Sequence, residues 1–115
     1  MQLFGIPNCN TVKKARDWLE NNGVAYEFHD FKKNGVSHAL LENWLKQTPW
    51  EKLVNRAGMT WRNLSDTEKA AVHDNESAIK LMLEKSSVIK RPVLVKDGKI
   101  MSLGFNEATY QELLS

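Results

Sequence analysis

The sequence predicts an α/β layered domain, not a helix bundle. The chain opens with a strand–helix–strand pattern, continues through several short helices, and ends with a β-hairpin and a final helix. Its 115 residues fit one compact domain, and it has no repeat and no stretch with the composition of a linker. We therefore expect a single domain over residues 1–115.

The first third of the chain gives the strand–helix–strand pattern. Residues 2–6 form a short apolar run that ends at Pro7-Asn8, as expected for a buried strand. From about residue 10 to 22, apolar positions recur at helical spacing, and Gly23 provides the left-handed stop. The apolar positions are Val12, Ala15 and Leu19. Residues 24–31 alternate in polarity and predict a second strand, with a turn after it at Asn34-Gly35.

The middle of the chain is predicted to be helical. Ser37 can cap a helix with the apolar stripe Leu40, Leu41, Trp44 and Leu45. The segments Thr48–Glu51 and Ser65–Glu68 both have the pattern of a capping box. In this motif the side chain of the first residue accepts the backbone N–H of the fourth, and the side chain of the fourth accepts the backbone N–H of the first. A further helix is expected to open at Asn75 and to bury Ile79, Met82 and Leu83.

The end of the chain changes from helical to alternating periodicity. Residues 92–95 predict a strand, Asp97-Gly98 is a strong signal for a two-residue hairpin turn, and residues 99–101 predict the returning strand. Asn106 is expected to cap a last helix with the apolar stripe Tyr110, Leu113 and Leu114.

Composition excludes several classes of function. Sixteen Lys and Arg against fourteen Asp and Glu give a net charge of +2, which is too small to indicate a nucleic-acid or membrane partner. No apolar run approaches the roughly 18 residues of a membrane span, and the opening residues lack the pattern of a signal peptide. We expect a cytoplasmic monomer. The three histidines are scattered and there is one cysteine, so we expect neither a disulfide within the chain nor a metal site.

The single cysteine, Cys9, is the strongest candidate for chemistry. It falls between a predicted strand end and a predicted helix start, where unpaired backbone N–H groups and the positive helix end favour a thiolate. Lys13, one helical turn later, adds a positive charge. A lowered pKa makes Cys9 a good leaving group from a mixed disulfide, which favours two-step thiol exchange. Because the chain has no second cysteine, the thiol that resolves the intermediate must come from another molecule.

Three segments carry a resemblance to a known family. They are residues 6–15, Ile-Pro-Asn-Cys-Asn-Thr-Val-Lys-Lys-Ala, residues 55–64, Asn-Arg-Ala-Gly-Met-Thr-Trp-Arg-Asn-Leu, and residues 89–94, Ile-Lys-Arg-Pro-Val-Leu. In this order and spacing they resemble the arsenate reductase (ArsC)/Spx family over nearly the whole chain. Within that family the sequence is most similar to the small YffB-type proteins, regarded as glutathione-dependent thiol reductases. The resemblance implies a thioredoxin-like fold with a four-stranded mixed sheet in the order 2-1-3-4 and a helical insertion at about residues 37–88.

The resemblance also implies site residues. Cys9 matches the family's nucleophile, and Thr11 matches a hydroxyl able to bind the thiolate or a bound anion. Arg91 matches an arginine that faces the cysteine, and with Lys13 it would stabilise the thiolate. Pro92 is expected to be cis and to face Cys9, where backbone beside it can pair with an extended peptide such as glutathione. The polar neighbours Asn8 and Asn10, together with Arg56 as a second oxyanion arginine, complete the predicted substrate-binding set.

The preferred function is a glutathione-dependent thiol reductase without a bound cofactor, with glutathione as co-substrate and glutathione or a glutaredoxin as the resolving thiol. Glutaredoxin-coupled arsenate reduction is the second hypothesis. Arsenate reductases of the family carry Gly-Thr-Ser-Arg where residues 10–13 are Asn-Thr-Val-Lys, and an arginine where this chain has Leu103-Gly104. An Spx-type regulator that docks on RNA polymerase is the third. Spx regulators use a Cys-x-x-Cys switch, and Val12 occupies the position of its second cysteine.

Overall fold

The computed structural model describes residues 1–114, and their contacts divide into two compact units. The first unit is Met1–Asn34 together with the chain from Arg91 onward, and the second unit is Gly35–Lys90. The bounds of the second unit lie within about two residues of the insertion that the family resemblance implies. Organisation as a single domain stays a prediction, and each unit is described by itself.

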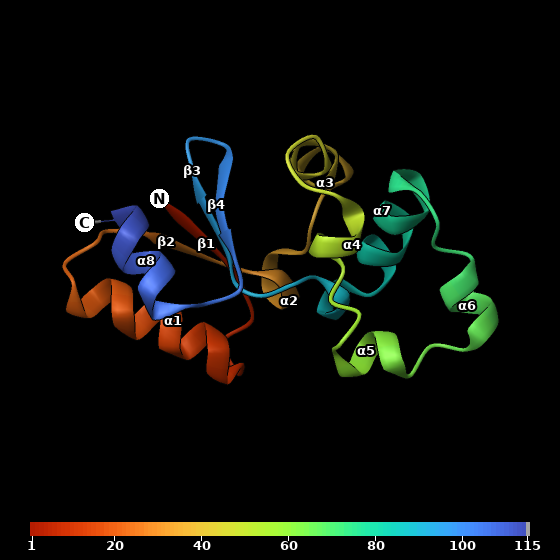
Figure 1. Ribbon diagram of the computed structural model, residues 1–115, viewed down its shortest axis with the longest axis horizontal. Coiled ribbons are helices and arrows are strands. Elements are labelled where there is room, and N and C mark those ends of the chain that lie inside the picture. Colours follow the sequence, from red (N-terminus) through yellow and green to blue (C-terminus); the bar gives the residue numbers. More distant parts are fainter. Residues whose placement is uncertain (115) are drawn as a thin grey trace. The chain divides into compact units, whose positions relative to one another are not determined.

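The first unit contains a four-stranded mixed sheet (Figure 1). Its strands are β1 (Gln2–Gly5), β2 (Glu27–Asp30), β3 (Val93–Lys96) and β4 (Lys99–Leu103), in the order β2-β1-β3-β4. Strand β1 pairs in parallel with β2 and antiparallel with β3, which pairs antiparallel with β4. The structure thus confirms the predicted α/β class and the predicted strand order.

Two helices of the first unit share one hydrophobic core. Helices α1 (Asn10–Asn21) and α8 (Glu107–Leu114) lie side by side in Figure 1, and the Trp18 and Tyr110 rings meet edge-on with centroids 5.6 Å apart. The sheet contributes Leu3 and Leu94, which are opposite each other on β1 and β3. This core fixes α1, and therefore the loop that precedes α1, against the centre of the sheet.

The hairpin and the caps of the first unit form as predicted. Asp97 and Gly98 both have positive φ, 52° and 80°, which is the geometry of a type I′ turn between β3 and β4. Gly23 ends α1 with a φ of 66°. The Asn106 side chain accepts a hydrogen bond from the Thr109 N–H at 3.0 Å and caps α8.

The second predicted strand is wrong at both ends, because residues 24–26 are not part of the paired strand and Phe31 is helical. Pairing of β2 begins at Glu27, whose N–H bonds to the Met1 carbonyl at the start of β1. At the other end the Asp30 carboxylate accepts the Lys32 N–H at 2.9 Å. That bond starts the short helix α2 (Phe31–Asn34), which buries Phe31.

In the second unit the described residues form short helices joined by loops and one isolated β-bridge, Val54 with Ile89. Ser37 caps its first helix, as predicted, and Ser65 with Glu68 forms the predicted capping box. Asn75 opens the helix in which Ile79 and Met82 are buried. The elements are α3 (His38–Leu45), α4 (Trp50–Leu53), α5 (Met59–Arg62), α6 (Asp66–Ala70), α7 (Asn75–Glu84) and the 3-10 helix η1 (Ser86–Val88).

Three predictions about helices are wrong. No capping box forms at Thr48, because the Thr48 N–H bonds back to the Trp44 carbonyl and closes the turn after α3, so that α4 begins one residue after Pro49. Leu83 is 43% exposed, since the buried side of α7 contains Leu81 instead. Leu113 is 40% exposed because Tyr110 fills the core under α8.

In the part of the chain that the structure describes, no helix has both the length and the apolar character needed to cross a bilayer.

Gly5 allows β1 and α1 to pack closely. A Cβ atom on Gly5 would lie 2.8 Å from the Cγ2 of Val12, a fully buried residue in the first turn of α1. Val12 is β-branched and therefore has few rotamers with which to move aside. A glycine at this strand end thus sets the distance between the sheet and the start of α1.

We predict that Gly5→Ala lowers the free energy of unfolding by about 1–3 kcal/mol, because the new methyl group overpacks Val12. Urea unfolding of Gly5→Ala, Val12→Ala and the double variant gives a double-mutant cycle. The double variant should lose clearly less than the sum of the single losses, because Val12→Ala makes room for the methyl. Additive losses would show that Gly5 and Val12 do not constrain each other.

We also predict that Tyr110→Phe leaves stability unchanged or raises it by up to about 2 kcal/mol. The Tyr110 side chain is fully buried, and its hydroxyl has no hydrogen-bond partner among the described residues. Tyr26→Phe is the control, because the Tyr26 hydroxyl accepts a bond from Arg16 and donates one to Glu20, and it should cost about 0.5–1.5 kcal/mol. Thermal unfolding compares the two. A larger loss in Tyr110→Phe than in Tyr26→Phe would contradict this reading of the core.

Candidate functional site

Cys9 is the N-cap residue of α1. It lies in the short loop that joins the end of β1 to the helix, and its side chain is half-buried. The Cys9 carbonyl accepts the first hydrogen bond of the helix from the Lys13 N–H at 2.9 Å. Its extended backbone, with φ −111° and ψ 125°, directs the side chain towards the open N–H groups of the first turn.

Opposing effects determine the pKa of the Cys9 thiol. Burial raises it and is the largest single effect. The backbone N–H groups of Val12 and Thr11 lower it, although the sulfur does not form the short capping hydrogen bond that Ser37 forms in α3. The charge and side-chain hydrogen bonding of Arg91 lower it further. Together the lowering effects exceed that of burial, so the pKa lies below the ordinary value of a cysteine and the thiolate is favoured.

Arg91 and Pro92 bring the start of β3 to Cys9. The Arg91-Pro92 peptide bond is cis, as predicted. The Pro92 carbonyl accepts the Gly104 N–H at 2.8 Å, and Gly104 has a φ of 79°, which few residues other than glycine adopt. The end of β4 therefore holds Pro92 in place, and the residue before it, Arg91, contacts the Cys9 sulfur.

The other predicted residues near Cys9 differ in what they contribute. Thr11 acts on the sulfur through its backbone N–H, whereas the prediction was based on its hydroxyl. Asn8 and Asn10 flank Cys9 and are exposed, so they are open to a substrate. Lys13 is exposed on α1 and is not among the groups that lower the Cys9 pKa. The substrate-binding roles of Asn8 and Asn10 and the stabilising role of Lys13 stay predictions.

Arg56 belongs to the second unit and therefore has no described place in the geometry around Cys9. It is exposed in the loop between α4 and α5, and its guanidinium lies 5.6 Å from the centroid of the Trp50 ring. That distance is within the range of a cation–π contact. Its predicted role in binding an oxyanion stays a prediction.

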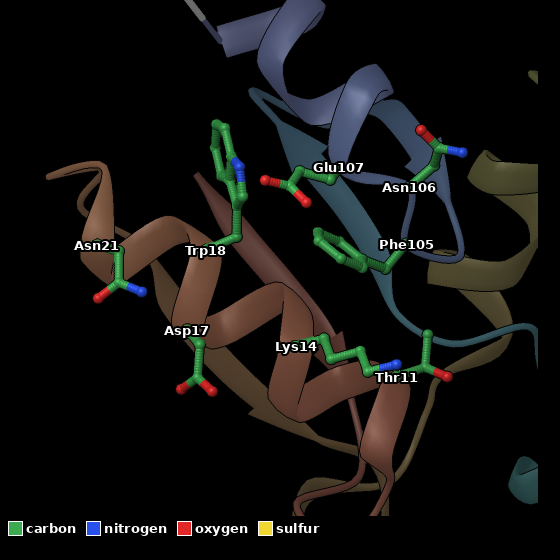
Figure 2. Close-up of a pocket in the computed structure, with 8 residues that line it drawn as sticks. All are labelled: Thr11, Lys14, Asp17, Trp18, Asn21, Phe105, Asn106 and Glu107. Carbon is green, nitrogen blue, oxygen red and sulfur yellow. The ribbon is translucent and has the colours of Figure 1, made fainter.

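A groove of about 570 Å³ runs between α1 and α8 in the first unit (Figure 2). Thr11 is at its end nearest to Cys9, and the side chains of Trp18, Phe105 and Glu107 point into the space between the two helices. No local sequence pattern predicts this groove, because Asn106 has the pattern of a helix cap and Trp18 is not in the predicted apolar stripe Val12, Ala15 and Leu19. The full lining is Thr11, Lys14, Asp17, Trp18, Asn21, Phe105, Asn106 and Glu107.

His38 lies in a surface cluster with two carboxylates of the second unit. It is 3.5 Å from Glu42 and 3.8 Å from Glu76, and all three side chains are exposed. Exposed pairs of this kind contribute little to stability. We treat the cluster as surface ion pairing, and the absence of a metal site stays a prediction.

Comparison with known proteins gives consistent relatives over the whole chain. The ArsC family model matches residues 4–113. A solved structure named YffB protein is 43% identical and covers 99% of this chain and 98% of its own, with a TM-score of 0.92. An arsenate reductase (ArsC) related protein from Brucella melitensis is 49% identical and covers 96% of this chain and 91% of its own, with a TM-score of 0.79.

A more distant relative carries a different name. The global transcriptional regulator Spx of Streptococcus pyogenes is 29% identical over 116 residues, which cover 98% of this chain and 84% of the regulator. The thioredoxin-like architecture, the three sequence segments and these matches agree with one another. The chain belongs to the ArsC family.

Proposed function

We propose that this chain is a glutathione-dependent thiol reductase in which Cys9 forms a mixed disulfide with glutathione. Membership of the ArsC family, together with an arsenate reductase-related relative, supports a thiol-based oxidoreductase. The observation that carries the finer proposal is the Cys9 sulfur, half-exposed and held towards the thiolate by two backbone N–H groups and Arg91. A nucleophile or leaving group needs this combination of charge and access.

In the first step the Cys9 thiolate attacks the glutathione sulfur of a disulfide substrate. A new S–S bond joins Cys9 to glutathione, the original S–S bond breaks, and its electron pair leaves with the other sulfur of the substrate. In the second step an external thiolate, from glutathione or a glutaredoxin, attacks the glutathione sulfur of this adduct. Cys9 then departs as a thiolate, which its lowered pKa makes easier.

Arg91 and Pro92 have complementary roles in this scheme. The planar guanidinium of Arg91 suits a carboxylate of glutathione as well as the departing sulfur. The backbone beside Pro92 aligns the extended tripeptide in this scheme by strand-like pairing, the role that the family resemblance implies. Both residues lie directly before β3, and the bond from the Gly104 N–H to the Pro92 carbonyl restrains this backbone.

The sequence around the site favours this function over the two alternatives. The chain has Val12, Lys13 and Leu103-Gly104 where the family's arsenate reductases have a serine and two arginines, so it offers fewer bidentate donors to a multiply charged oxyanion. Val12 also removes the second cysteine of an Spx-type switch. The buried Val12 side chain and the positive φ of Gly104 give both residues packing and backbone roles instead.

We predict that Arg91→Ala raises the pKa of Cys9, because the substitution removes a positive charge and a hydrogen-bond donor from the thiolate. The rate of Cys9 alkylation by iodoacetamide, measured against pH, reports the thiolate fraction. The midpoint of the profile should move to higher pH, so that the variant reacts more slowly than wild type at neutral pH.

Lys33→Ala is the matched control, because Lys33 is an exposed cation in α2. It should leave the alkylation profile in place, and Lys13→Ala should move it less than Arg91→Ala does. Equal alkylation profiles for Arg91→Ala and wild type would show that Arg91 does not stabilise the Cys9 thiolate.

The proposed function itself is tested by mass spectrometry after exposure to glutathione disulfide. We predict an adduct of one glutathione per chain on Cys9, lost on addition of reduced glutathione and absent in Cys9→Ser. Wild type should also catalyse the reduction of a small disulfide by glutathione, and Cys9→Ser should not. Arsenate turnover by a chain that forms no such adduct would overturn the proposal in favour of oxyanion reduction.

A further inference from the structure

The groove between α1 and α8 starts at the first turn of α1, directly after Cys9 in the chain. Thr11 belongs both to the groove lining and to the N–H groups that act on the Cys9 sulfur. From there the groove follows one face of α1 through Lys14 and Trp18 to Asn21, as Figure 2 shows. The rise of a helix places Asn21 about 15 Å beyond Thr11 along the axis of α1.

This length exceeds the reach of glutathione. Cysteine is the middle residue of the tripeptide, so a single residue extends from it on either side, to less than about 10 Å. A substrate polypeptide, whose cysteine is joined to the glutathione that Cys9 attacks, needs about four or five extended residues to reach from this point to Asn21. The outer end of the groove is therefore accessible to a polypeptide and out of reach of glutathione.

The lining changes along the groove in a way that suits a polypeptide. Lys14 lies near Thr11, the Trp18 and Phe105 rings lie further along, and the exposed carboxylate of Glu107 lies beside the rings. Asp17, also exposed, adds a second carboxylate to the lining. Both rings contact the buried ring of Tyr110, with centroids 5.6 Å and 4.8 Å away, and are held in position by it. Half-buried Phe105 and the small exposed part of Trp18, next to exposed carboxylates, suit a segment with apolar and basic residues.

We propose that this groove binds an extended polypeptide segment, so that the substrate of Cys9 is a mixed disulfide between glutathione and a protein cysteine. The inference rests on the proposed function of Cys9. The Cys9 thiolate attacks the glutathione sulfur, the Cys9–glutathione bond forms, and the electron pair of the broken bond leaves on the protein sulfur, which takes up a proton. A second glutathione thiolate then releases Cys9 and gives glutathione disulfide.

The test uses a series of synthetic peptides, each with one cysteine carried as its glutathione mixed disulfide. The peptides extend from one to about six residues beyond the cysteine, with one lysine in the outer part. Wild-type kcat/KM should rise by about tenfold or more as the peptide lengthens, because each added residue makes further contacts in the groove. The gain should level off near five residues. Peptides extended on the opposite side of the cysteine show which direction occupies the groove.

Asn21→Trp blocks the far end of the groove at an exposed helix terminus, and Asn34→Trp makes the same change at the exposed end of α2. Asn21→Trp should abolish the gain with length, whereas Asn34→Trp should retain it. A wild-type rate that does not depend on length, or a gain that survives in Asn21→Trp, overturns the groove proposal while the thiol chemistry stands. If even the shortest peptide is not reduced, the proposed function itself fails.

Discussion

The site depends on the interaction of one sulfur atom with the start of α1 and with Arg91. Partial burial alone would leave Cys9 a neutral, inert thiol, because burial raises its pKa. The open N–H groups of Val12 and Thr11 and the Arg91 guanidinium reverse that effect. The negative charge on the sulfur is therefore stabilised mainly by backbone N–H groups and one side chain. This requires that the start of α1 and the residue before β3 be held close together.

The fold holds these two points through the centre of its sheet. Strand β1 leads into α1 and pairs directly with β3, which begins after Arg91-Pro92. Gly5 allows Val12, at the start of α1, to pack on the sheet. The Gly104 N–H bonds to the Pro92 carbonyl just before β3. A glycine therefore helps to position each of the two segments. With one cysteine in the chain, this arrangement suits chemistry that is completed by the thiol of another molecule.

Sequence reasoning found the elements with strong local signals and missed the details that depend on tertiary packing. The sheet order followed from the family resemblance, and the Asp97-Gly98 turn and the Ser65 capping box followed from local chemistry. The start of β2 and the failure of Thr48 to cap α4 depend on backbone hydrogen bonds, from the Glu27 N–H to the Met1 carbonyl and from the Thr48 N–H to the Trp44 carbonyl. Cys9 and Arg91 were identifiable from motifs, whereas the groove joins residues of α1 and α8 that no local pattern connects.

The most direct test of this account is the ionisation of Cys9 in the folded chain and in the same chain unfolded in denaturant. Thiolate absorbance in the ultraviolet, followed against pH, measures both, and Cys9→Ser provides the background. The account predicts a lower titration midpoint for Cys9 in the folded chain, because the N–H groups and Arg91 lie near the sulfur only when the chain is folded. A folded midpoint equal to or above that of the unfolded chain would show that burial prevails, and Cys9 would not be the nucleophile.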